Sequence, residues 1–219
     1  MRQRTLLALA ASLAALAGGH AASSAVSTPG ARPESRPEAR PESRRAFFGE
    51  LHIHTGYSFD AFALMGSRAE PDAAWRFAMG EPVSYLGQTV QRSRPLDFMA
   101  ITDHAEYLGA SMRGLADPQS AFARTKAGSL MMSDPLGAAL GKLVGALAGD
   151  EESRGAMAAV NDDSWKYQLG LVEKYNRPGT FTSFAAYEWT AMWGGRENMH
   201  RNVIFRDRAP AAPYTAAES

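Results

Sequence analysis

Four short apolar runs, separated by stretches with helical spacing, restrict the fold of this chain more than any other feature. The runs are residues 46–53 (AFFGELHI), 96–102 (LDFMAIT), 180–187 (TFTSFAAY) and 202–205 (NVIF). Helix-like sequence lies between them, notably at 135–148 and 163–174. Short strands that alternate with helices predict an α/β fold with a parallel sheet or barrel.

Polar residues with metal-binding side chains stand at the ends of three of these runs. They are His52, His54, Asp103, His104 and Glu188. In α/β sheets and barrels, functional side chains gather at the carboxyl ends of the strands. We therefore expect these side chains to meet at one rim of the fold. His200 differs, because it precedes its run.

The H-x-H triplet has a spacing that suits metal binding. Residues two apart on a strand project to the same side, so His52 and His54 can bind one cation. The chain has no cysteine, and imidazole with carboxylate suits zinc or another divalent transition metal. A carboxylate such as Glu188 can bridge two ions. The alternative is that each histidine has a structural role; four of the five lie at strand boundaries beside Asp or Glu, which favours metal binding.

The N-terminal segment has the composition of a leader followed by a linker. Arg2 and Arg4 precede an apolar run at 6–17 and then small residues, which predicts a secretory signal peptide over 1–22. The run is too short for a membrane span, which needs about 20 apolar residues. We expect a periplasmic or extracellular protein; a disordered or anchoring N-terminus is the alternative. Residues 23–45 repeat Arg-Pro-Glu and predict a disordered linker.

Residues 46–219 are long enough to form one domain with a sizeable core. They carry 16 basic and 20 acidic side chains, which gives no basic surface for nucleic acid. Residues 105–165 predict a helical insertion, either a mobile cap over the metal site or an ordinary insertion. Helical spacing also predicts core packing for Trp165, Leu169, Val172 and Tyr175.

Four segments resemble the PHP (polymerase and histidinol phosphatase) superfamily, and most closely its secreted DUF3604 branch. The segments are GELHIHTGYSFD, PLDFMAITDHAEYLG, PGTFTSFAAYEWT and NMHRNVIFRD. The resemblance implies a distorted (β/α)7 TIM-like barrel that holds two or three divalent ions, such as Zn, Mn or Fe. It also implies hydrolysis of phosphate esters.

The resemblance further implies a role for each matched residue. Asp103 would orient an imidazole without binding an ion, and Glu188 would be the bridging carboxylate. Asp60 falls where many members carry a third ligand to the ion held by the H-x-H pair. The full set of implied ligands is His52, His54, Asp60, His104, Glu188 and His200.

The sequence departs from the family pattern after His200. The pattern continues with a further histidine and an Asp-x-His pair, and neither follows here. We therefore expect residues 46–219 to be the N-terminal part of a longer domain, with the barrel incomplete at its C-terminus. Arg196 and Arg201 lie beside His200 and could bind substrate oxygens, since guanidinium groups pair with phosphate through two hydrogen bonds. Surface arginines are the alternative.

Together these features predict a metal-dependent hydrolase, specifically a phosphoesterase that uses metal-activated water on an unknown small-molecule or polymer ester. Two other functions stay open. An amidohydrolase also begins with H-x-H but bridges its metals with a modified lysine at a strand end. The lysines here lie in helix-like or loop sequence, at 126, 142, 166 and 174. An exported module that holds metal or ligand without catalysis is the other. The sequence does not indicate an oligomeric state.

Overall fold

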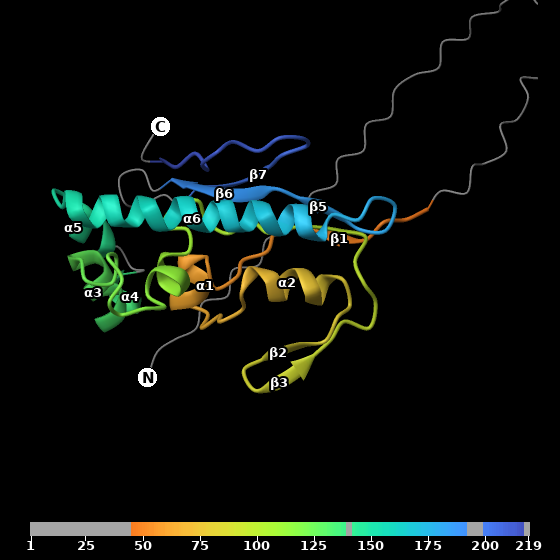
Figure 1. Cartoon of the computed structure of the whole chain (residues 1–219), viewed down its shortest axis with the longest axis horizontal. Helices are drawn as coiled ribbons and strands as arrows, with labels where there is room; N and C mark the ends of the chain where they lie inside the picture. Colours follow the sequence, from red (N-terminus) through yellow and green to blue (C-terminus); the bar gives the residue numbers. More distant parts are fainter. Residues whose placement is uncertain (1–44, 139–141, 192–198, 217–219) are drawn as a thin grey trace, which may run out of the picture. The chain divides into compact units, whose positions relative to one another are not determined.

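The computed structural model describes residues 45–138, 142–191 and 199–216. The expected signal peptide and all of the expected linker except Arg45 lie outside these residues. The described part is a mixed α/β fold with small sheets and one long helix (Figure 1). No helix within these ranges is both long enough and apolar enough to cross a membrane.

The central sheet is parallel, as the sequence predicts, but its strands are short. It consists of β1 (Gly49–Glu50), β4 (Phe98–Ala100) and β5 (Thr182–Phe184), in the order β1-β4-β5. Backbone hydrogen bonding continues beyond the strand ends, because Thr102 N donates to Ile53 O at 2.8 Å. The chain that carries the H-x-H triplet is thereby held beside the chain that leads to Asp103.

A second sheet, the hairpin of β6 (Ala186–Ala191) and β7 (Met199–Ile204), extends this arrangement. A parallel bridge pairs His104 with Glu188. Its hydrogen bonds run from Glu188 N to Asp103 O at 3.0 Å and from Ala105 N to Glu188 O at 2.8 Å. Because β7 is antiparallel to β6, the start of β7 lies beside the end of β6. A third sheet, the hairpin of β2 (Val83–Tyr85) and β3 (Gln88–Val90), is separate.

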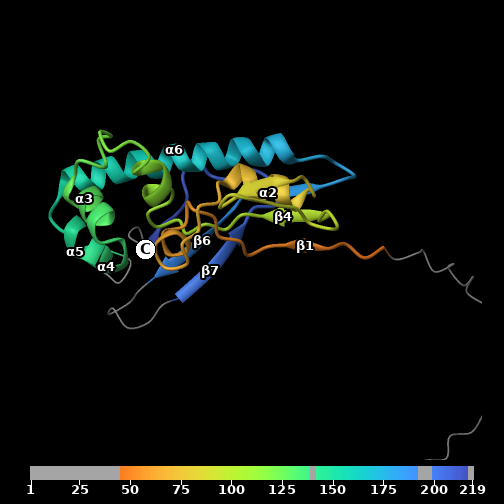
Figure 2. The same ribbon diagram turned by 90° about the horizontal axis from the view of Figure 1, so that it is seen from below.

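Two helices, α2 (Pro71–Ala78) and α6 (Glu151–Tyr175), cover the same face of the central sheet (Figure 2). Their apolar residues pack in one buried cluster with Met99 of β4 and with Phe181, the residue before β5. Trp75 of α2 stacks on Tyr175 of α6, with ring centroids 6.2 Å apart, and meets Phe181 edge to face. Trp165 packs in a neighbouring cluster with Tyr57 and other residues.

The region 105–165 is helical and has a core of its own. It contains the single-turn π-helix η1 (Ala110–Gly114), α3 (Lys126–Ser133), α4 (Pro135–Gly137), α5 (Leu143–Leu147) and the first half of α6. Gly109 precedes η1 with a φ of 72°, and a side chain there would collide with Ser164 of α6. The short helix α1 (Phe59–Ala63) packs against this region.

The element boundaries differ from the expected ones in several places; the run 180–187, for example, is divided between β5 and β6. The run 46–53 forms only the two-residue strand β1, and the helix expected at 163–174 begins earlier, at Glu151. Asp150 explains the earlier start, since its carboxylate accepts a hydrogen bond from Ser153 N at 3.2 Å and caps the helix. The helix expected at 135–148 is divided into α4 and α5, with 139–141 outside the described residues. Glycines weaken such a helix.

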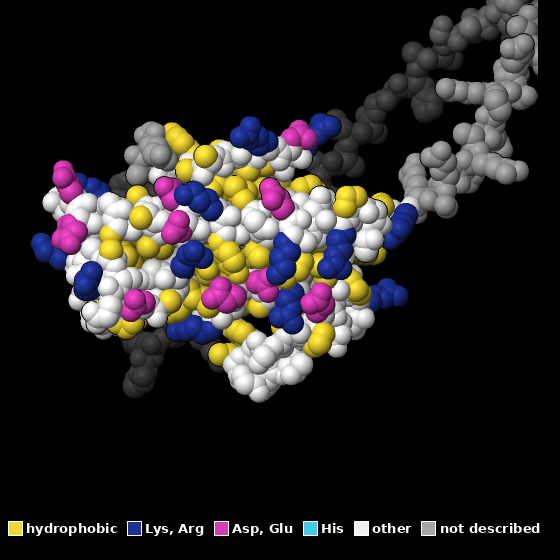
Figure 3. Space-filling model, in the orientation of Figure 1, with side chains coloured by type: hydrophobic (Ala, Val, Ile, Leu, Met, Phe, Trp, Pro, Cys, Tyr) yellow, Lys and Arg dark blue, Asp and Glu magenta, His cyan; other side chains and the backbone are white. Residues whose placement is uncertain are grey.

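The charged side chains show no concentration of one sign on the face in Figure 3, where basic and acidic groups are interspersed. None of the sheets in the described ranges closes on itself. The (β/α)7 barrel therefore stays a prediction.

Candidate metal centre

The H-x-H triplet lies immediately after β1, at the carboxyl end of the parallel sheet. Both backbone groups of Ile53, the residue between the histidines, bond to Thr102. Ile53 N donates to Thr102 Oγ1 at 3.0 Å, and Ile53 O accepts from Thr102 N. The two imidazoles lie with ring centroids 5.2 Å apart. The side chain of His52 is 63% exposed and that of His54 is 17% exposed. The pair therefore spans the boundary between solvent and interior.

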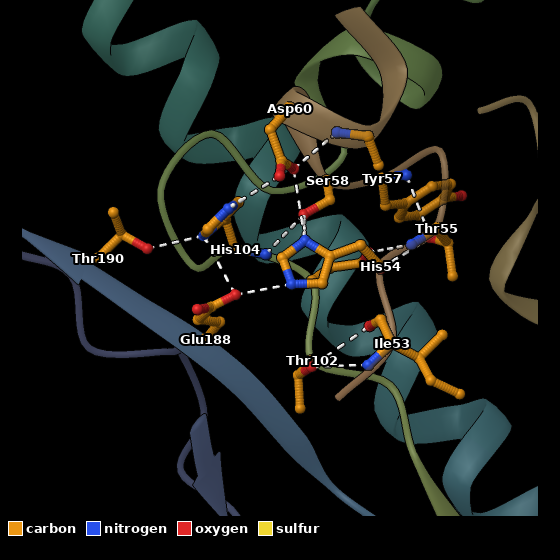
Figure 4. A network of polar contacts seen from close by, with 12 residues as sticks. Ile53, His54, Thr55, Tyr57, Ser58, Asp60, Thr102, His104, Glu188 and Thr190 are labelled. Carbon is orange, nitrogen blue, oxygen red and sulfur yellow. Dashed lines mark hydrogen bonds and ion pairs between the residues drawn. The ribbon is translucent and has the colours of Figure 1, made fainter. Parts of the chain in front are cut away.

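Glu188 contacts all four histidines of the site, and Figure 4 shows its carboxylate facing His54 and His104. Its side chain is only 3% exposed, and it projects from β6 toward four imidazoles. Its Oε2 lies 2.6 Å from His54 Nε2, 3.4 Å from His52 Nε2 and 3.7 Å from His104 Nδ1. Its Oε1 lies 3.0 Å from His200 Nδ1. One buried carboxylate thus faces every histidine in the described part of the chain.

Asp60 forms a second acidic position from the first turn of α1. Its Oδ1 lies 3.3 Å from His54 Nδ1, and its Oδ2 lies 3.5 Å from His104 Nε2. Burial tends to raise the pKa of Asp60, but the hydrogen bonds with His104 and His54 outweigh it and hold the pKa well below its usual range. Burial tends to lower the pKa of His54, and Asp60 more than offsets this, so that pKa lies above its usual value.

Three overlapping groups of side chains are close enough to hold a cation. They are His52, His54 and Glu188; His54, Asp60 and His104; and His104, Glu188 and His200. Within each group the ligand atoms lie within 4.8 Å of one another. The donors are imidazole nitrogens and carboxylate oxygens, which suit zinc and divalent transition metals. The set agrees with the six residues expected from the sequence.

One atom of the site supports a cation directly. His54 Nε2 is buried and makes no hydrogen bond, although Glu188 Oε2 lies only 2.6 Å away. Buried polar atoms without a hydrogen bond are rare, and each requires an explanation such as an ion. A cation between this nitrogen and the carboxylate would satisfy both groups. The residues present therefore fit a metal ion.

Asp103 contacts different groups from those expected. Its buried carboxylate accepts hydrogen bonds from Thr55 N at 2.5 Å, Thr55 Oγ1 at 2.7 Å and Gln168 Nε2 at 2.7 Å. No hydrogen bond joins it to an imidazole in the described part. Burial raises the pKa of Asp103 to about 6. Asp103 thus fixes the backbone that follows the H-x-H triplet to helix α6, in place of orienting a histidine ring.

His200 reaches the site because of the direction of its strand. It lies within β7, opposite Thr190 of β6, although the sequence pattern placed it before a strand. The antiparallel pairing brings this early part of β7 beside the second half of β6, two residues beyond Glu188, which itself pairs with Asn202. Arg201 is exposed, and its Nη1 donates to His200 O at 2.7 Å. Arg196 lies outside the described residues.

Three polar residues at the site were not predicted from the sequence. Ser58 Oγ lies 2.8 Å from His54 Nδ1, and Thr190 Oγ1 lies 2.7 Å from His104 Nδ1. Glu106 accepts hydrogen bonds from the backbone N–H groups of Thr190, at 3.1 Å, and Ala216, at 2.9 Å. Their positions held a clue, since Thr190 and Glu106 each stand two residues after a predicted ligand.

The geometry defines a candidate metal centre at the rim of an α/β fold, rich in buried carboxylate. A family described as "Protein of unknown function (DUF3604)" matches residues 41–219, and the chain belongs to this family. This confirms the DUF3604 part of the expected resemblance. A search of curated proteins found no match, and a search of solved structures found none either.

Proposed function

We propose that this chain carries the cation-binding part of a metal-dependent phosphoesterase acting on an unknown phosphate ester. The observation that carries the proposal is the buried nitrogen His54 Nε2, which lacks a hydrogen bond and faces the buried carboxylate of Glu188. Both groups lie beside further imidazoles in three overlapping ligand groups. Several adjacent cation positions suit displacement at phosphorus better than a single isolated one.

The side chains would share the cations as follows. His52 and His54 would hold the first with Oε2 of Glu188, and Oε1 of Glu188 would reach the second beside His200. Asp60 would contribute to a third with a further histidine. When bound, divalent cations supply Lewis acidity, which polarises phosphoryl oxygens and activates water.

The protein's own groups would then orient the substrate and protect the site. His52, the most exposed of the four site histidines, marks the side of the cluster that we propose solvent and substrate reach. Arg201 is exposed next to His200, and we propose that it binds ester oxygens together with Arg196. The proposal also includes the (β/α)7 PHP barrel and export of the protein, for which the sequence is the support.

The positions of the lysines favour this proposal over an amidohydrolase. Lys126 lies in α3, and Lys166 and Lys174 lie in α6. Lys142 Nζ lies 2.6 Å from Asp134 Oδ2, in the helical insertion. None of the four stands at a strand end, where a modified bridging lysine is needed. Glu188, whose two carboxylate oxygens face His54 and His200, would take the bridging role instead.

The test compares two matched substitutions in the full chain. Glu188→Gln keeps the shape of the central side chain and removes its charge, whereas Glu81→Gln does the same in the exposed Arg76–Glu81 ion pair. Zn²⁺ and Mn²⁺ binding is measured by calorimetry, and chromogenic phosphate mono- and diesters report hydrolysis. We expect Glu188→Gln to weaken cation binding by at least about 100-fold, beyond the usual range for groups that only support a ligand, and to abolish hydrolysis.

The controls decide between the alternatives. Glu81→Gln should bind and hydrolyse like the wild-type chain. Equal cation binding by wild type and Glu188→Gln would refute the metal centre. Tight binding by the wild type without hydrolysis of any ester would instead support a non-catalytic metal-holding module.

A further inference from the structure

Two hydroxyl groups contact the Nδ1 atoms of the site histidines. Ser58 Oγ lies 2.8 Å from His54 Nδ1. Thr190 Oγ1 lies 2.7 Å from His104 Nδ1 and 3.1 Å from His200 Nδ1. Figure 4 shows these contacts on the side of His54 and His104 away from their Nε2 atoms. Both hydroxyls are held in place, because Ser58 is fully buried and Thr190 N is bonded to Glu106.

The overlap of the ligand groups creates a problem that these hydroxyls can solve. His54 and His104 each belong to two of the three groups. A neutral imidazole has one N–H donor and one nitrogen with a free lone pair. Each ring can therefore serve one cation at a time, through one nitrogen. The partner of the other nitrogen decides which one is available.

For His54, the partners select Nε2 as the ligand atom. Nδ1 faces Ser58 Oγ and, at 3.3 Å, Asp60 Oδ1. Asp60 at Nδ1 and Glu188 at Nε2 are both carboxylates, which only accept hydrogen bonds when ionised. When a cation lies between Nε2 and Glu188, Nε2 must supply its lone pair, so the one proton of the neutral ring lies on Nδ1. Nε2 then keeps its lone pair and faces Glu188. His54 is thereby assigned to the group with His52 and Glu188. Asp60 lies at the opposite ring nitrogen, Nδ1, and can accept a hydrogen bond from it.

For His104, the same reasoning depends on Thr190. A cation between His104 Nε2 and Asp60 Oδ2, which are 3.5 Å apart, requires the proton on Nδ1. The carboxylate of Glu188 lies 3.7 Å from Nδ1, beyond hydrogen-bond distance. Thr190 Oγ1, at 2.7 Å, can accept the hydrogen bond from this N–H. Without the Thr190 hydroxyl, the Nδ1–H group of His104 would have no hydrogen-bond acceptor when Nε2 binds a cation.

We propose that Ser58 and Thr190 are positioning residues whose hydroxyl oxygens accept hydrogen bonds from Nδ1–H of His54 and His104 and so commit each ring to one cation through Nε2. The inference rests on the proposed cation site. It does not depend on which ester is hydrolysed, or on hydrolysis at all.

The experiment measures binding of Zn²⁺ alone and the proton position on each ring. Thr190→Val removes the hydroxyl at nearly constant shape, Thr190→Ser keeps it, and Ser58→Ala removes the other hydroxyl. Thr89→Val and Ser84→Ala, exposed cross-strand partners in the β2–β3 hairpin, are the matched controls. Long-range ¹H–¹⁵N correlation on ¹⁵N-histidine-labelled protein identifies the protonated nitrogen, and calorimetry gives the affinity.

We expect the proton on Nδ1 of both rings in the Zn²⁺-loaded wild type. Thr190→Val should weaken the binding step that involves His104 by about 10–100-fold, and Ser58→Ala should weaken the step that involves His54 by a similar factor. Thr190→Ser should restore most of the affinity, and both hairpin variants should match the wild type.

Three results would overturn the inference. The first is a proton on Nε2 of His54 or His104 in the Zn²⁺-loaded wild type. This measurement does not depend on whether any variant folds. The second is unchanged Zn²⁺ affinity in Thr190→Val, and the third is a folded Thr190→Ser as weak as Thr190→Val. Normal binding and proton positions without ester hydrolysis would refute the phosphoesterase and leave the roles of Ser58 and Thr190 standing.

Discussion

The metal centre and the helical insertion lie at opposite extremes in what they bury. The centre buries polar groups, among them Thr55, Ser58, Asp103, His104 and Glu188. The insertion buries an apolar cluster that includes Phe122, Ala127, Met131, Leu143 and Met157. Apolar burial stabilises a region by itself, whereas buried charge is costly unless it is paired. Apolar packing therefore accounts for the stability of the insertion, whereas a bound cation would stabilise the candidate metal centre.

Helix α6 connects these two regions. Its first half contributes Met157 to the apolar cluster of the insertion. Its second half contributes Gln168, whose Nε2 donates to Asp103 beside the metal ligands. Helix α6 thus contributes residues both to the apolar cluster of the insertion and to the candidate metal centre. Substitutions on either side show whether the two regions are energetically separate.

The largest expected effect is in the insertion. Phe122 is 1% exposed, and Phe122→Ala should lower the free energy of unfolding by about 3–5 kcal/mol through the cavity it leaves. Denaturant unfolding measures this loss. Phe47→Ala is the control, because Phe47 is 62% exposed and its removal should change stability by about 0.5 kcal/mol or less.

Zn²⁺ binding by the Phe122→Ala variant tests whether the insertion and the candidate metal centre are energetically separate. If the regions are separate, folded Phe122→Ala keeps the Zn²⁺ affinity of the wild type; a large loss would show that they form one unit. Hydrogen exchange in residues 105–165 tests the predicted mobile cap. Exchange as slow as in the central sheet would contradict it.

An intermediate effect is expected from pH at the metal centre. The pKa of Asp103 is about 6 in the folded protein and about 3.9 when unfolded, so the folded state binds a proton more tightly. The ionised carboxylate therefore costs stability above pH 6, and this cost decreases as the pH falls below 6. From pH 7 to 5, metal-free wild type should gain about 1.4 kcal/mol relative to Asp103→Asn. Parallel stability curves for the two proteins would contradict the raised pKa.

The smallest effect is expected at the contact between α6 and the centre. Gln168→Ala removes one of the three hydrogen bonds to Asp103 and should cost about 1 kcal/mol of unfolding free energy. The exposed Gln119→Ala provides the control. If the hydrogen bond from Gln168 helps to hold Asp103 and the adjacent ligands in position, Gln168→Ala also weakens Zn²⁺ binding measurably. An unchanged affinity would limit the role of Gln168 to stability.

From the sequence alone, the candidate metal-binding residues and much of their location could be predicted. Residue type and the two-residue period of a strand are local properties, so His52 and His54 could be recognised as a pair. The apolar run before Asp103 predicted that this residue follows a strand of the parallel sheet, whereas Glu188 lies within β6 of the antiparallel hairpin. The core role of Trp165 and Tyr175 followed from helical spacing in the same way.

Only the tertiary structure decided which groups contact which. The antiparallel direction of β7 brings His200 to Glu188, and the paths of distant segments place Thr190 against His104 and Gln168 against Asp103. These contacts join residues far apart in the chain, and they depend on strand register and helix packing. No local pattern encodes them, because the free energy that fixes register comes from the packing of the whole domain.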